Sequence, residues 1–104
     1  PIATLSATSI DFGAVRAGAT VSRTVTLTNT GSTPLHLGVP IVFMETDLTT
    51  ATDCTWRTLA PGQHCSITET FQPGGGPVRL HATVFLTDDA PSGREEIDVR
   101  GTST

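Results

Sequence analysis

The residues best suited to covalent or metal chemistry are the two cysteines, Cys54 and Cys65, which stand eleven positions apart. A zinc site needs about four ligands arranged in close pairs. His64 adjoins Cys65, but Cys54 has no ligand residue two to four positions away. This spacing favours a disulfide over half a metal site or two free thiols. A disulfide predicts an oxidising compartment, and therefore an extracellular, cell-surface or periplasmic location.

Nucleophilic catalysis needs a nucleophile, a base and an orienting group within reach of one another. Ser66 and the three histidines could supply such groups, but no serine stands in a nucleophile-elbow motif. His36 and His81 occupy alternate positions of expected strands whose side chains face away from the core, which we call outward parity. His64 adjoins a Pro-Gly turn. The acidic residues are scattered, whereas a carboxylate-pair hydrolase needs two opposed acids. We therefore expect no catalytic residues and no enzymatic activity.

A calcium site is the remaining metal hypothesis, with Asp88 and Asp89 joined by Asp47 or Asp53. Calcium takes six or more oxygen ligands from a preorganised loop. Two adjacent aspartates before Ala-Pro more often form a turn. The sequence therefore predicts neither a metal nor a cofactor.

Charge and hydropathy exclude two classes of partner. The net charge is −4, all six basic residues are arginine, and no run of like charges occurs. A nucleic-acid surface needs clustered basic residues, so we expect no nucleic-acid partner. No apolar run reaches the roughly 18 residues of a membrane span, so we expect no membrane insertion.

Apolar and hydroxyl residues alternate along most of the chain, which contains twenty threonines. Threonine fits the pleated, half-solvated surface of a sheet. Period-two runs occupy residues 5–12, 21–29, 34–43, 65–71, 80–87 and 97–101, separated by turn-forming residues. Pro40 within the third run predicts an edge position or a bulge. Six to eight short strands predict one all-β sandwich domain over residues 1–104.

Several short motifs carry a family resemblance, in order from about Leu5 to Thr102. They are Ile10-Asp11-Phe12-Gly13, Val25-Thr26-Leu27-Thr28-Asn29-Thr30-Gly31, Pro34-Leu35, Leu59-Ala60-Pro61-Gly62 between Cys54 and Cys65, Phe71-Gln72-Pro73, Ala90-Pro91 and Val99-Arg100-Gly101-Thr102. Together they resemble the abnormal-spindle/hydin-like immunoglobulin-like domain, whose bacterial members are often labelled choice-of-anchor D.

The resemblance implies an immunoglobulin-like β-sandwich of seven to eight antiparallel strands with one disulfide. It brings no catalytic residues, and the family's two cysteines correspond to Cys54 and Cys65. Bacterial relatives look like repeated modules of surface and secreted proteins. This sequence departs from the family at Glu69, where a core-facing valine is usual.

The inward parity of Glu69 requires either a bulge that turns it outward or a partner for its charge. Arg23 shares the inward parity of Val25 and Leu27, and its guanidinium fork matches a carboxylate. We therefore expect an ion pair between Arg23 and Glu69 near the margin of the sandwich.

Two aromatic residues are candidate interface residues. Trp56 lies within the cysteine loop, where it could stack on a sugar or cap the end of the sandwich against the disulfide. Phe85 has outward parity between Val84 and Leu86, which suits a contact with a partner or a tolerated exposed ring.

The expected function is a non-enzymatic building block of a stalk, filament or virion appendage. Such a module would associate with copies of itself or with sister domains through its faces, edges or termini. The alternative is a recognition module whose loops bind glycan or a surface protein. A groove with aromatic neighbours near Trp56 would favour glycan.

Overall fold

Alternating burial along each strand confirms the period-two patterns of the sequence. The computed structural model describes residues 1–42, 47–74, 78–91 and 93–103. Within these ranges β3 (Val21–Asn29) buries Val25 and Leu27 and turns its threonines away from the core. The other strands are β1 (Ala3–Leu5), β2 (Ser9–Val15), β4 (Leu35–Val42), β5 (Leu48–Thr52), β6 (Thr58–Leu59), β7 (His64–Phe71), β8 (Val78–Asp88) and β9 (Arg94–Ser103).

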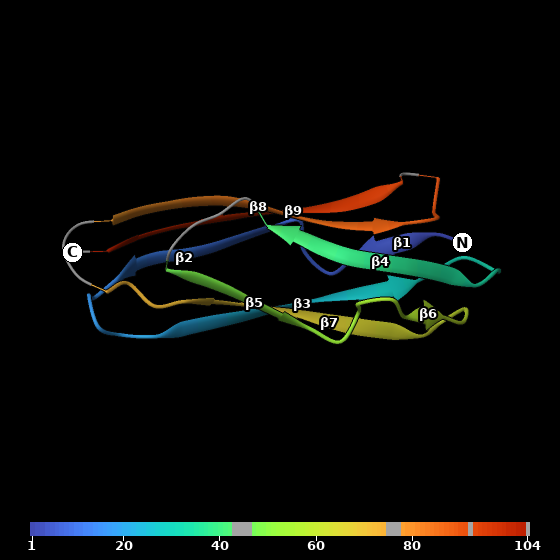
Figure 1. The fold of residues 1–104 in the computed structure, drawn as a ribbon, viewed down its shortest axis with the longest axis horizontal. Helices are drawn as coiled ribbons and strands as arrows, with labels where there is room; N and C mark the ends of the chain where they lie inside the picture. The colour runs from blue at the N-terminus through green and yellow to red at the C-terminus, as the bar shows by residue number, and fades with distance from the viewer. Residues whose placement is uncertain (43–46, 75–77, 92, 104) are drawn as a thin grey trace.

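The strands form two sheets that lie one over the other along the molecule, as Figure 1 shows. One sheet has the order β1-β3-β7-β5 and the other β2-β9-β8-β4-β6. This confirms the predicted all-β, immunoglobulin-like sandwich. Two details differ from the expectation, because the described residues form nine strands and β2 pairs with β9 in parallel. The parallel pairing arises where the chain leaves one sheet after β1 and joins the edge of the other as β2.

The core is one cluster of apolar side chains between the sheets. Within this cluster the rings of Phe12 and Phe71 are in contact, with centroids 5.6 Å apart. Gly101 in β9 packs against both rings, since a Cβ there would lie 3.1 Å from Phe71 and 3.2 Å from Phe12. Only glycine lets the backbone approach the two rings so closely.

Asn29, the last residue of β3, is a buried structural residue. Its Nδ2 donates to the carbonyl oxygens of Thr33 (2.8 Å) and Leu59 (2.9 Å). Its Oδ1 accepts from the backbone N–H of Gly31 at 3.0 Å. The side chain is fully buried and hydrogen bonded at both ends, so it joins the β3–β4 turn to β6.

The prediction of an edge position or bulge at Pro40 is confirmed. The register of β4 against β8 shifts between Leu37 and Pro40, and β6 pairs with Leu35 and His36 of β4. Phe43, the last residue of the predicted third run, lies outside the described residues.

The domain is a rod of 47 × 19 × 17 Å, and the two ends of the chain lie at opposite ends of its long axis (Figure 1). In the part of the chain that the structure describes, no helix is both long and apolar enough to cross a bilayer.

Candidate functional site

The two cysteines form the predicted disulfide, with their Cα atoms 5.4 Å apart. Both are buried within the core cluster. Cys54 follows β5 of the four-stranded sheet, where the chain crosses toward β6 of the other sheet, and Cys65 lies in β7. The bridge therefore fastens the crossing segment to a central strand.

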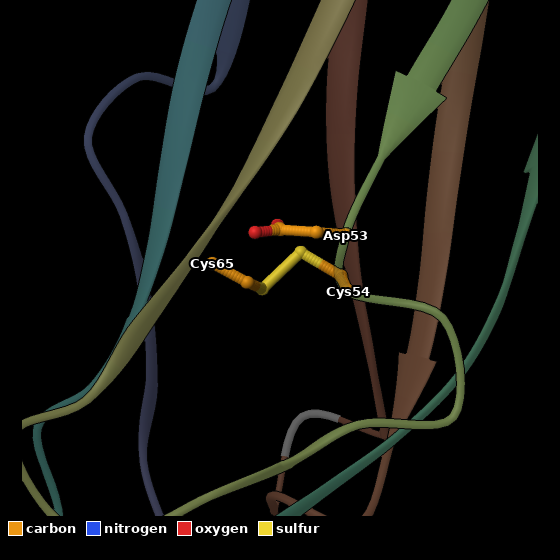
Figure 2. Close-up of side chains that lie close together, drawn as sticks. All are labelled: Asp53, Cys54 and Cys65. Atoms are coloured by element: carbon orange, nitrogen blue, oxygen red, sulfur yellow. A yellow bond between two sulfur atoms is a disulfide. The ribbon is translucent and has the colours of Figure 1, made fainter.

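Asp53 lies beside the disulfide, as Figure 2 shows, with a carboxylate oxygen within 4.8 Å of both sulfur atoms. Its Oδ1 accepts from the Ser66 N–H at 2.8 Å, and its Oδ2 accepts from Arg57 Nη1 at 3.3 Å. Both sulfur atoms are committed to the disulfide, and both carboxylate oxygens already have donors. The three residues therefore form a structural clamp between the β5–β6 loop and β7, and they do not fit a metal site.

Trp56 occupies the tight turn that follows Cys54, in which the Arg57 N–H donates to the Cys54 carbonyl at 3.1 Å. Its backbone φ is +55°, in the left-handed region that glycine and asparagine favour. The side chain is 74% exposed, which corrects the expectation that the ring caps the sandwich against the disulfide. The Trp56 N–H donates to the Gly38 carbonyl at 3.1 Å and so fixes the turn to β4, which directs the indole outward.

Phe85 has the predicted outward parity on β8, between buried Val84 and Leu86. The guanidinium of Arg94 lies 4.6 Å from the centre of its ring, and Arg94 also pairs with Glu96 at 3.1 Å. Phe85 is therefore covered by a cation–π contact. This cover makes it a weaker candidate interface residue than Trp56.

Glu69 faces the core as its parity predicts, and it is fully buried. Arg23 is its direct register partner on β3, but the predicted ion pair is not formed. The Arg23 Nη1 instead donates to the Ser22 carbonyl at 2.9 Å, and its side chain stays exposed. The partner of Glu69 is Thr50 of β5, whose hydroxyl lies 2.9 and 2.8 Å from the two carboxylate oxygens. Burial, partly offset by the Thr50 hydrogen bond, raises the pKa of Glu69 to about 7.

Of the candidate catalytic and calcium residues, His36, Asp88 and Asp89 make local structural hydrogen bonds. His36 Nδ1 lies 2.7 Å from Asp89 Oδ2, and the backbone N–H of His36 donates to Asp89 Oδ1 at 2.8 Å. The backbone N–H first, and then the ring, lower the pKa of Asp89. Asp88 Oδ1 accepts from the Ala90 N–H at 2.9 Å. Among the described residues, Asp47 and Asp53 do not join these aspartates in a ligand cluster, so the pair closes the turn.

A hollow on the outer face of the five-stranded sheet was not expected from the sequence. It is lined by Asp11, Gly13 and Ala14 of β2, Arg79, Leu80 and His81 of β8, and Arg100, Gly101 and Thr102 of β9. The outward parity of Arg79, His81 and Arg100 was available in the sequence. Their convergence depends on the pairing of β8 and β9, which sequence patterns do not specify.

These features define the class of protein as an immunoglobulin-like sandwich stapled by one buried disulfide. The chain belongs to the HYDIN/CFA65/VesB-like Ig-like domain family, whose model matches residues 1–102. The hydin-like resemblance is thereby confirmed, whereas the narrower choice-of-anchor D assignment stays a prediction. No curated protein sequence matches the chain.

Solved structures with the same fold include modules of larger proteins. The chain is 21% identical to the secreted serine protease VesC of Vibrio cholerae (TM-score 0.65), covering 89% of this chain and 21% of VesC. A Porphyromonas gingivalis protein of unknown function is 22% identical (TM-score 0.78), with 96% and 46% covered. The V. cholerae VesB protease is 19% identical (TM-score 0.67), with 97% and 31% covered. The chain thus spans less than half of each of these proteins, and at such identities the likeness concerns the fold alone.

Proposed function

We propose that this chain is a non-catalytic, in-line spacer module of an extracytoplasmic protein. The observation that carries the proposal is the path between the chain's two ends. They lie at opposite ends of the 47 Å axis, and β2 and β9 run side by side between them in parallel (Figure 1). A module of this shape adds length between neighbouring domains without folding the chain back on itself.

The parallel pair gives the module a means of resisting tension. Force applied at the chain ends pulls the start of β2 one way and the end of β9 the other. The strands must then slide past each other, so their hydrogen bonds carry the load together. In an antiparallel pair pulled apart from one end, the bonds open one after another at lower force.

The proposed cellular location rests on the disulfide and on a structurally similar protein that is secreted. A buried disulfide persists in oxidising compartments. VesC, a neighbour of the same fold, is described as secreted. On these two grounds we infer an extracellular, cell-surface or periplasmic location for the whole protein. Its partners would be copies of this module or sister domains, with Trp56 as the leading apolar contact because its ring is exposed on a strained backbone.

Single-molecule force spectroscopy tests the spacer role. In one geometry the domain is pulled through its two termini, which loads β2 against β9 in shear. In the matched geometry it is pulled between an attachment point at Arg79 and the C-terminus. Arg79 pairs with Thr102, so these points load the same domain as a zipper. We expect a higher unfolding force in the terminal geometry at equal loading rate. Equal forces in the two geometries would overturn the load-bearing role.

A further inference from the structure

The hollow on the outer sheet face exists because β2 is irregular there. The register of β2 against β9 shifts between Asp11 and Ala14, so Gly13 and Ala14 both face outward in succession. Gly13 has φ +67°, and its N–H donates to Asp11 Oδ1 at 2.8 Å. Neither residue has a long side chain to fill the space. The result is an open hollow of about 580 Å³.

Two arginines border this hollow although the chain as a whole is acidic. Arg100 lies between Asp11 of β2 and His81 of β8, its direct register partners. Arg79 pairs with Thr102, one step further along the same face. Diagonal neighbours of this kind lie about 7–8 Å apart at their Cα atoms, so both guanidinium groups can reach one small anion. Two of the six basic residues of a chain with net charge −4 therefore border a single hollow.

The arginine side chains at the hollow keep hydrogen-bond donors that can bind a ligand. Asp98 accepts from Arg100 Nε at 3.1 Å through Oδ2, and its Oδ1 lies 3.2 Å from His81 Nε2. This arrangement leaves the two terminal nitrogens of Arg100 to donate elsewhere. Arg79 forms no ion pair within the part of the chain that the structure describes. Two guanidinium groups are thus available to bind an anion.

Asp11 narrows the class of ligand. Asp11 is the register partner of Arg100 on β2, and the negative charge of its carboxylate at the hollow repels a densely charged polyanion such as a nucleic acid. The same carboxylate accepts hydrogen bonds from hydroxyl groups. A ligand that satisfies both ends of the hollow carries one carboxylate and neighbouring hydroxyls. We propose that this hollow binds an acidic saccharide through a uronic-acid unit, with its carboxylate on Arg79 and Arg100 and its hydroxyls on Asp11. This role is separate from the spacer function and uses a different measurement.

Titration of the ¹⁵N-labelled domain with a galactose oligosaccharide that carries a single galacturonic-acid unit, followed by amide chemical shifts, tests the proposal. We expect changes confined to residues 11–14, 79–81 and 100–102. The neutral galactose oligosaccharide of equal length should give none. Arg79→Ala and Arg100→Ala should each weaken binding about tenfold, since a charge-assisted hydrogen bond is lost. Arg23→Ala removes the same charge from the other sheet and should leave binding unchanged.

Two further titrations decide between ligand classes. A polyglutamate peptide offers carboxylates without hydroxyls, and inorganic phosphate offers the anion alone. Asp11→Asn should weaken binding of the saccharide and strengthen binding of both comparators. Preference of the unaltered protein for the peptide or for phosphate would overturn the saccharide assignment. Saccharide binding that survives in the double variant Arg79→Ala/Arg100→Ala would overturn the site itself, because the spectrum also reports whether each variant is folded.

Discussion

Glu69 makes the stability of this domain depend on pH in the direction opposite to that of most paired carboxylates. The carboxyl is fully buried, and the hydroxyl of Thr50 is its hydrogen-bond donor. Its pKa rises from the ordinary value of 4.5 to about 7, chiefly through burial. The folded state therefore holds the proton more tightly than the unfolded state does. The stabilisation is complete below pH 4.5, falls as pH rises toward 7, and is absent above pH 7.

The size of the effect follows from the two pKa values. The interval from 4.5 to about 7 corresponds to about 3 kcal/mol, at roughly 1.36 kcal/mol per pH unit. Such a loss is a large fraction of the roughly 5–15 kcal/mol that stabilises a typical domain. For a chain of this length it corresponds to a melting-temperature difference on the order of 10–20 °C.

Urea unfolding of the wild type and of Glu69→Gln, at intervals from pH 5 to pH 8.5, measures this loss. Glutamine keeps the shape of the side chain and can hydrogen bond with Thr50 without a charge. The free energy of unfolding of the variant, minus that of the wild type, should rise by about 3 kcal/mol across this range. Taking the difference at each pH cancels the pH-dependent contributions that the two proteins share. Asp89 does not contribute in this range, because its pKa is lowered from the ordinary value of 3.8.

Two matched variants identify the partner of Glu69. Thr50→Val removes the donor and should steepen the pH dependence, because the carboxylate loses its hydrogen bond. Arg23→Met should change it little, since Arg23 donates to Ser22. A difference between wild type and Glu69→Gln that stays constant from pH 5 to pH 8.5 would refute the buried titration. A large effect of Arg23→Met on the pH dependence would instead support the ion pair between Arg23 and Glu69.

Two further predictions concern the cysteine loop. Reduction of the Cys54–Cys65 disulfide removes a cross-link that restricts the unfolded chain over eleven residues, so the free energy of unfolding should fall by about 3 kcal/mol. A chelator should leave the melting temperature unchanged, and a drop with chelator alone would indicate a metal. Trp56→Gly should be more stable than Trp56→Ala by about 1 kcal/mol in thermal unfolding, because only glycine relieves the left-handed backbone; equal stabilities would mean that the turn carries no strain.

Parity was the most informative property of the sequence. It placed Val25, Leu27 and Glu69 inward and Phe85 outward, and the burial of each agrees. Period two reports which face of a strand a residue occupies, because side chains alternate strictly across a sheet. Parity does not report which strand lies alongside. Arg23 has the right parity and even the right register, yet Thr50 of the weakly patterned β5 takes the contact.

Irregular backbone was beyond the reach of the same reasoning. Trp56 is exposed because a left-handed residue sets the direction of its turn, and the surrounding residue types do not specify such a turn. The outer-face hollow depends on a register shift at Gly13, which the sequence shows only as the end of a strand. The two candidate sites of this domain thus arise where the regular pattern of the sheets is interrupted.

The position of Thr50 explains how a sandwich tolerates a fully buried acid. Among the strands that the structure describes, β5 is the edge strand of its sheet and pairs with β7. Below neutral pH, Thr50 and the protonated Glu69 form a neutral pair that fastens this edge to its neighbour. Above neutral pH a single hydroxyl offsets only part of the cost of the buried charge, and the edge is held less firmly. The disulfide fastens the same two segments just beyond Thr52, so the bridge secures β5 at the pH where the side-chain contact is weakest.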